Sequence, residues 1–175
     1  MRLLFCVFLL INITSSSVAQ DESSLDPLKN QLSNITSDID KVDTLILMYN
    51  HYYSINSDSA LYYAQLAYDL AEKINYKKGQ IISMTNIGLV HFYNGSLGNA
   101  LKSYLESNEL VGEYVDAKSE DEFAQYQLSK NLNNIGLIYL NQGKLEDAES
   151  YLLRSLAIDK NLGNKIAIAN CYNNL

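Results

Sequence analysis

The sequence has little proline and little glycine, and these two shortages exclude an all-β protein. One proline and eight glycines among 175 residues supply too few turns for a chain of many short strands. Contents of 47% apolar and 19% charged residues are typical of a folded domain, and they exclude disordered and collagen-like chains. We therefore expect an all-α fold.

Cysteine and positive charge are also scarce. Only Cys6 and Cys171 are present, and Cys6 lies in an apolar segment that we expect to be removed, so no intramolecular disulfide can stabilise the fold. The 20 acidic residues outnumber the 13 basic ones, which gives a formal net charge of −7. Repulsion from phosphate makes nucleic acid and anionic membrane surfaces unsuitable partners for the mature chain.

The first residues have the features of an export signal. Arg2 supplies a positive start, residues 3–11 form an apolar run, and residues 17–19 (Ser-Val-Ala) offer a cleavage site. The run is shorter than the roughly 20 residues of a membrane span, and Cys6 does not lie at the cleavage point, so neither an anchor nor a lipid is expected. We predict a signal peptide in residues 1–19 and a periplasmic or cell-envelope location in a bacterium.

The rest of the chain contains internal repeats. Residues 86–89 (Asn-Ile-Gly-Leu) recur as residues 134–137, an offset of 48 residues. Further matches at this offset are Gly95 with Gly143, Ala100 with Ala148, and Leu105 with Leu153. A weaker copy, offset by 40 residues, contains Ala60, Ala64 and Ala67. Residues 173–175 resemble the start of another copy, which we interpret as the first helix of a fourth, truncated repeat.

Each copy predicts two antiparallel helices joined by a glycine turn. Glycine inside a helix costs about 0.5–1 kcal/mol relative to alanine, so the recurrence of Gly88 and Gly136 predicts a close crossing by a neighbouring helix. A disordered stub and a short helix are expected in residues 20–36. Longer helices are expected near 38–54, 58–74, 78–94, 97–117, 120–142, 145–159 and 163–175.

These residues resemble the tetratricopeptide repeat (TPR) pattern, which has a large apolar residue, then Leu-Gly, Tyr, Gly, Ala, an aromatic residue and Ala. The third copy fits best, with Leu132, residues 135–136, Tyr139, Gly143, Ala148, Leu152 and Ser155. The resemblance implies a TPR-type α-solenoid in residues 37–175, with about three repeats before the fourth. Its 40 to 48 residue repeats exceed the usual 34 or so, so we expect longer helices on both sides of Ser119.

The resemblance also implies a binding groove lined by the first helix of each repeat. In TPR proteins that hold extended peptides, an asparagine two residues before the small glycine position often binds the ligand, and here it is Asn86 or Asn134. Lys130 lies one helical turn before Asn134 and adds a positive charge for a carboxylate. The apolar wall is predicted to be Leu89, Tyr93 and Leu137. In the alternative interpretation, the asparagines only join neighbouring helices.

No motif for catalysis, phosphate binding or metal binding occurs, so neither an enzyme nor a cofactor is expected within these residues. The two histidines, His51 and His91, fall at the tyrosine position of the repeat and are interpreted as packing residues rather than metal ligands. Tyrosine is abundant, with 14 copies. Those in residues 49–68 form a second candidate recognition surface or an apolar edge covered by half-polar rings.

The predicted function is therefore to bind a protein or peptide as an exported scaffold. Residues 58–64 and 134–139 also resemble the N-terminal TPR regions of bacterial sensor histidine kinases and helix-turn-helix regulators. That resemblance implies that the chain is the periplasmic sensing part of a longer signalling protein. The alternative is a structural or assembly spacer in the cell envelope.

Overall fold

The computed structural model describes residues 32–115 and 121–175, and within these two ranges it contains helices and no strands. Residues 32–34 are helical. The longer helices are α2 (Asp38–Tyr52), α3 (Ser57–Lys73), α4 (Lys77–Tyr93), α5 (Leu97–Tyr114), α6 (Glu122–Asn141), α7 (Leu145–Leu162) and α8 (Lys165–Asn174). The predicted all-α solenoid is confirmed. The predicted signal peptide and most of the stub lie outside the described residues.

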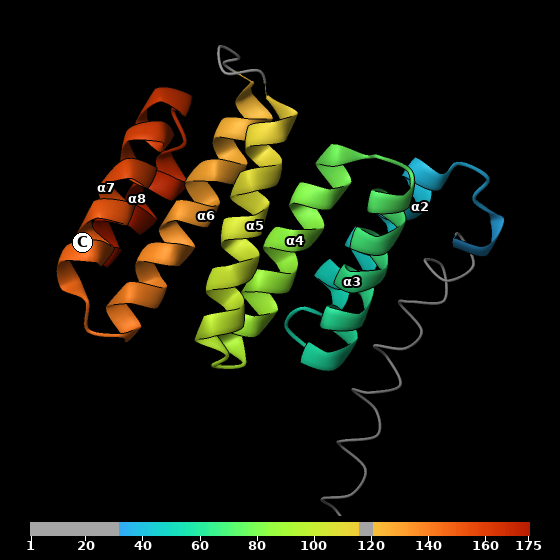
Figure 1. The fold of residues 1–175 in the computed structure, drawn as a ribbon, viewed down its shortest axis with the longest axis horizontal. Coiled ribbons are helices and arrows are strands. Elements are labelled where there is room, and N and C mark those ends of the chain that lie inside the picture. Colours follow the sequence, from blue (N-terminus) through green and yellow to red (C-terminus); the bar gives the residue numbers. More distant parts are fainter. Residues whose placement is uncertain (1–31, 116–120) are drawn as a thin grey trace, which may run out of the picture.

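The helices form antiparallel pairs that stack side by side. Helices α2 and α3, α4 and α5, and α6 and α7 form the pairs, and α8 packs on α7 (Figure 1). Each pair contacts the next, through α3 with α4 and α5 with α6. No helix in the described part of the chain is both long and apolar enough to cross a membrane.

Polar caps start four of the helices close to their predicted positions. The side chains of Ser37, Asn56, Asp121 and Asn164 each accept a hydrogen bond from the backbone N–H three residues later, at 2.8–3.3 Å. Such bonds satisfy N–H groups that have no partner within the helix. Ser119, which separates the two helices that were expected to be longer, lies outside the described residues, and Asp121 caps α6.

The expected lengthening is seen in α6, which has 20 residues against 17 in α4, whereas α5 has 18, the same as α7. Residues 116–120, which include the predicted end of the helix near 97–117, lie outside the described residues. Helix α5 ends at Tyr114 because Val115 adopts an extended backbone conformation.

The predicted close crossings are confirmed at both glycines. A Cβ atom at Gly88 would lie 2.7 Å from Cε1 of Tyr104, and one at Gly136 would lie 2.8 Å from Cγ of Leu152. Real Cβ atoms do not approach other carbons this closely, so each first helix needs glycine to reach its partner helix. The turn glycines serve differently, because Gly95 and Gly143 have φ angles of 73° and 71° that side chains other than glycine rarely adopt.

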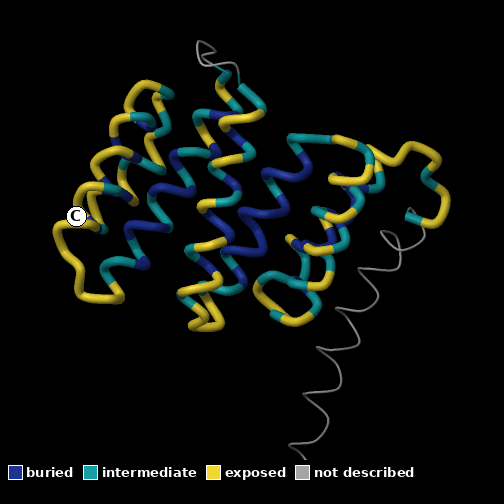
Figure 2. Tube along the Cα trace, in the orientation of Figure 1, coloured by how far each residue is buried: buried dark blue, intermediate teal, exposed yellow. Residues whose placement is uncertain are grey.

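Burial is concentrated in the middle of the stack (Figure 2). Helix α4 contacts α2, α3, α5 and α6, and ten of its residues are buried. Helix α8 lies at the end and buries only Cys171, while Ile166 and Tyr172 are exposed. The middle helices therefore provide most of the core, as expected for a stack in which each repeat contacts only its neighbours.

Candidate ligand-binding groove

The six predicted groove residues lie on two neighbouring first helices. Asn86, Leu89 and Tyr93 belong to α4, and Lys130, Asn134 and Leu137 belong to α6; the two helices are in contact. They differ in exposure, because Tyr93 is 68% exposed whereas Asn86 is 4% exposed. One face of the two helices therefore presents a mixture of buried amide and exposed aromatic ring.

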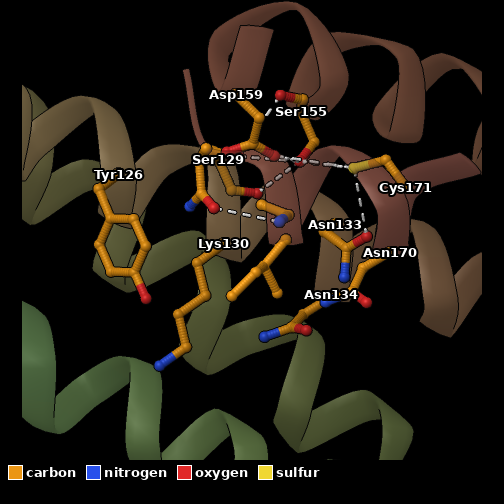
Figure 3. A pocket seen from close by; sticks show the side chains of 12 residues that line it. Tyr126, Ser129, Lys130, Asn133, Asn134, Ser155, Asp159, Asn170 and Cys171 are labelled. Atoms are coloured by element: carbon orange, nitrogen blue, oxygen red, sulfur yellow. Dashed lines mark hydrogen bonds between the residues drawn. The ribbon is translucent and has the colours of Figure 1, made fainter. Parts of the chain in front are cut away.

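An open cavity of about 470 Å³ lies between α6, α7 and α8, and Figure 3 shows it from close by. Two of the six predicted residues, Lys130 and Asn134, line it. Asn86, Leu89, Tyr93 and Leu137 lie outside it. The other residues of its wall are Tyr126, Ser129, Asn133, Ser155, Asp159, Asn164, Ile166, Ala167, Asn170 and Cys171. A volume of this size is in the usual range for small-molecule and peptide-anchor sites.

The asparagine that joins helices in the middle of the stack is Asn131, which was not among the predicted residues. Its Nδ2 donates to Ser107 Oγ at 3.0 Å and to Asn108 Oδ1 at 2.9 Å. Its Oδ1 accepts a hydrogen bond from Thr85 Oγ1 at 3.0 Å. These contacts link α4, α5 and α6, so a buried asparagine of the scaffold does exist at this level.

The two predicted asparagines behave differently from Asn131. The Asn134 Nδ2 atom is buried and makes no hydrogen bond of good geometry with the described residues, and the Asn86 side chain makes no hydrogen bond with any of them. Burial raises the pKa of Tyr104, and a weak side-chain hydrogen bond with Asn134 acts in the opposite direction. Beyond this weak contact, the Tyr104 hydroxyl has no hydrogen-bond partner among the described residues. Asn174, the corresponding residue of α8, instead donates to Asn133 Oδ1 at 3.1 Å.

Lys130 places a positive charge at the cavity with no acidic residue paired to it among the described side chains. It is half-buried, and this burial lowers its pKa because the charged ammonium loses hydration. A lysine in this state gains from any ligand that brings an anionic or hydrogen-bond-accepting group to the cavity.

The opposite end of the cavity is a buried polar cluster from three helices. Ser155 Oγ donates to the Ser129 carbonyl oxygen at 2.9 Å and lies 3.0 Å from Ser129 Oγ. The Asp159 Oδ2 atom lies 3.4 Å from Ser155 Oγ and 3.8 Å from Cys171 Sγ. Burial raises the pKa of the Cys171 thiol, so it acts as a weak donor and not as a nucleophile.

Asp159 is the residue that sequence reasoning missed. It is 2% exposed, and its Oδ1 atom has no hydrogen-bond partner. The repeat offsets contained a signal for it, because the same position in the two earlier copies is occupied by Ala71 and Val111, both buried. An acidic residue at a position that otherwise fills the core needs an explanation beyond packing.

The tyrosines of the first pair form a separate aromatic cluster. Tyr52 and Tyr63 stack at 5.4 Å between ring centroids, and Tyr53 meets Tyr93 edge-on at 5.6 Å. Tyr49 is buried while Tyr62 is 58% exposed, so the cluster both fills the core and covers the edge of the stack.

The chemistry of the cavity between α6, α7 and α8 suits binding. The polar groups of the cavity are donors at the Lys130 end and an acceptor at the Asp159 end, and the cysteine beside Asp159 is not activated. The half-buried His51 and His91 do not lie in the cavity wall, and among the described residues no group of three or more His, Cys, Asp or Glu side chains could hold a metal ion. TPR proteins are typically non-enzymatic interaction scaffolds.

Comparison with solved structures supports the fold. A crystal structure of BtubC (BKLC) from P. vanneervenii is similar with a TM-score of 0.68 and 15% sequence identity, over 91% of this chain and 68% of that one. At this identity the similarity shows the fold alone. No curated protein matches the chain.

Two family models match the sequence. Residues 129–162, which comprise most of α6 and all of α7, match a tetratricopeptide repeat. Residues 11–106 match the SusR N-terminal TPR domain, a segment that begins inside the predicted signal peptide and ends within α5. Because this second match spans more than half of the 175 residues, the chain belongs to the SusR N-terminal TPR domain family.

Proposed function

We propose that this chain is an exported TPR scaffold that binds a protein or peptide in the groove formed by α4 and α6, with its anchor in the cavity beside α8. One observation carries the proposal. The buried Asn134 amide nitrogen, which has at most a weak contact with the Tyr104 hydroxyl, lines the same cavity as Lys130, which has no acidic partner among the described side chains. Both are donors, so the site favours a carboxylate or a peptide carbonyl.

The scaffold alternative for the asparagines is weaker for Asn134 than for its neighbours. Asn131 and Asn133 already form the hydrogen bonds that join α6 to the adjacent helices. A buried polar group left without a partner costs about 1–3 kcal/mol, and a ligand that supplies the partner recovers this free energy.

The test starts from a random peptide library screened against the protein, followed by affinity measurement with the best peptide. Asn134→Ala is expected to weaken binding about 10- to 100-fold with little change in the melting temperature. Asn99→Ala, at an exposed asparagine of α5, is the matched control and should leave the affinity unchanged. An Asn134→Ala variant with a lower melting temperature and an unaltered affinity would make this asparagine part of the scaffold.

We further propose that the chain acts in the bacterial envelope as the sensing part of a signalling protein. The apolar segment after Arg2 and the family description of an N-terminal TPR domain support this context. Mass spectrometry of the protein from a periplasmic extract should give an N-terminus at Gln20. A chain that keeps Met1 in the cytosol would contradict export. If the chain is only a spacer, no library peptide should bind it with an affinity that Asn134→Ala lowers.

A further inference from the structure

We propose that the Asp159 end of the cavity binds a cationic nitrogen group of the ligand, either a free amino terminus or a lysine or arginine side chain. This inference rests on the proposed binding function and adds the charge that the ligand must carry. The site would then be two-ended, with an acceptor at Asp159 and donors at Lys130 and Asn134.

The hydrogen-bond donors around Asp159 are insufficient for its carboxyl group. Ser155 has one hydroxyl proton, and its nearest acceptor is the Ser129 carbonyl oxygen at 2.9 Å rather than Asp159 Oδ2 at 3.4 Å. Cys171 has one weak S–H donor, which lies as close to Asn133 Oδ1, at 3.7 Å, as to Asp159 Oδ2, at 3.8 Å. The Oδ1 atom has no hydrogen-bond partner in the part of the chain that the structure describes. The group therefore needs a donor from outside the described residues.

No basic side chain meets this need. Lys130 is the one lysine or arginine in the cavity wall, and it makes no ion pair with Asp159. In Figure 3 the Asp159, Ser155 and Cys171 side chains gather at one end of the cavity, while Lys130 and Asn134 extend toward the other. Taking a carboxyl group out of water without a cationic partner costs several kcal/mol, so a cationic ligand gains strongly here.

Packing does not require the acid. The equivalent position is filled by Ala71 in the first copy and by Val111 in the second, and both copies form the same helix pair. In the third copy, a cavity opens beside the acid. A polar group that the fold does not need, placed at a cavity wall, is best explained by a ligand that uses it.

The experiment uses four short probes and the whole chain. They are Ala-Ala-Ala with free ends, its N-acetylated form, and two N-acetylated tripeptides that begin with lysine or arginine. Affinity is measured by calorimetry at low salt. We expect acetylation to weaken binding of the first probe about tenfold or more. Recovery of affinity in the lysine or arginine probe would identify a side chain, rather than an amino terminus, as the natural source of the cation.

Two variants assign the effect to Asp159. Asp159→Asn keeps the size of the side chain and should abolish the preference for cationic probes, whereas Glu149→Gln, at an exposed acid of α7, should retain it. Equal binding of free and acetylated probes, a preference that survives Asp159→Asn, or no binding of any cationic probe would each overturn the inference. The library peptide tests the groove separately, since it depends on Asn134 whether or not a cation matters.

Discussion

Two neighbouring layers of the stack can be compared: the first is formed where α4, α5 and α6 meet, and the second where α6, α7 and α8 meet. Both contain the same hydrogen bond from a serine side chain to a backbone carbonyl, but the residues around it differ. Ser107 Oγ donates to the Ile81 carbonyl oxygen at 3.2 Å in the first, and Ser155 Oγ donates to the Ser129 carbonyl oxygen at 2.9 Å in the second. The two serines are 48 residues apart, as the repeat requires. The serine therefore belongs to the repeat, and the difference lies in its neighbours.

The neighbours satisfy one another in the first layer and not in the second. Asn131 bridges Thr85, Ser107 and Asn108 with three hydrogen bonds of 2.9–3.0 Å. In the second layer Cys171 takes the place of Asn131, and a partly unpaired Asp159 takes the place of Val111. A polar layer whose groups pair with each other stabilises the stack, whereas one that leaves groups unpaired beside a cavity is suited to a ligand.

The largest effect on stability is expected when Val111 and Asp159, which occupy the same position of the two layers, are each replaced by the other residue. Val111→Asp places a carboxylate among apolar neighbours without a partner and is expected to lower the free energy of unfolding by about 3–5 kcal/mol. Asp159→Val should raise it by about 1–3 kcal/mol and remove cation binding. Urea denaturation measures both. If both variants changed the free energy of unfolding in the same direction, positions 111 and 159 would not be equivalent positions of the repeat.

The second largest effect is expected at the bridging asparagine. Asn131→Ala removes three buried hydrogen bonds, to Thr85, Ser107 and Asn108, and should cost about 3 kcal/mol, although the Thr85 and Ser107 hydroxyls still bond to each other. Cys171→Ala removes a buried but weakly bonded thiol from the equivalent position and should cost about 1 kcal/mol. Thermal melts of the two variants compare the layers directly. If the two losses are equal, hydrogen bonding does not distinguish the layers.

The two crossing glycines should show that the backbone is the same in both layers. Gly88→Ala and Gly136→Ala each force a Cβ against a neighbouring side chain, which costs about 1–3 kcal/mol, and the gain in helix propensity offsets about 1 kcal/mol of it. A net loss of about 1 kcal/mol is expected for both. Gly112→Ala, with open space around it in α5, is the control and should be stabilising. If Gly136→Ala stabilised the protein, Gly136 could not lie against α7.

The smallest effect is a pH dependence specific to the second layer. Because burial lowers the pKa of Lys130, the unfolded chain binds that proton more tightly, and the contribution of Lys130 to the free energy of unfolding should rise with pH up to the ordinary lysine value of about 10.5. Lys130→Met should remove this rise and increase the stability at pH 7. Urea denaturation of both proteins at pH 7 and pH 10 measures it, with Lys165→Met as the control at an exposed lysine. If the free energy of unfolding of Lys130→Met changed between pH 7 and pH 10 as it does in the unaltered protein, the pH dependence would not come from Lys130.

Most of the fold could be predicted because its signals are local. Glycine at 95 and 143, polar caps before four of the helices and apolar residues at helical spacing depend only on nearby sequence, and the observed helix ends lie within a few residues of the predicted ones. The end of α5 was less predictable. The sequence pattern continued the helix to about residue 117, whereas α5 ends at Tyr114 and Val115 has an extended backbone conformation, because helix propensity is a weak guide to the last residues of a helix.

The candidate site was only partly predictable, since it depends on which side chains meet across helices. Lys130 and Asn134 were found from their place in the repeat, and the structure brings them to one cavity. Asp159 was not found, because it lies in the second helix of a repeat, outside the helices expected to line a groove. Comparing its position with Val111 would have found it without any structure.

The sequence alone determined that the chain forms stacked helix pairs, because the 40 and 48 residue offsets repeat a local pattern that is amphipathic in every copy. It also determined where backbones cross closely, since Gly88 and Gly136 recur at the same position of two copies, whereas Gly112 of α5 does not recur and has open space around it. Only the tertiary structure decided which asparagines hold the helices together and which remain unpaired. Hydrogen bonding between helices depends on distances of a few tenths of an ångström, and Asn131 and Asn134, three residues apart on one helix, reach different neighbours.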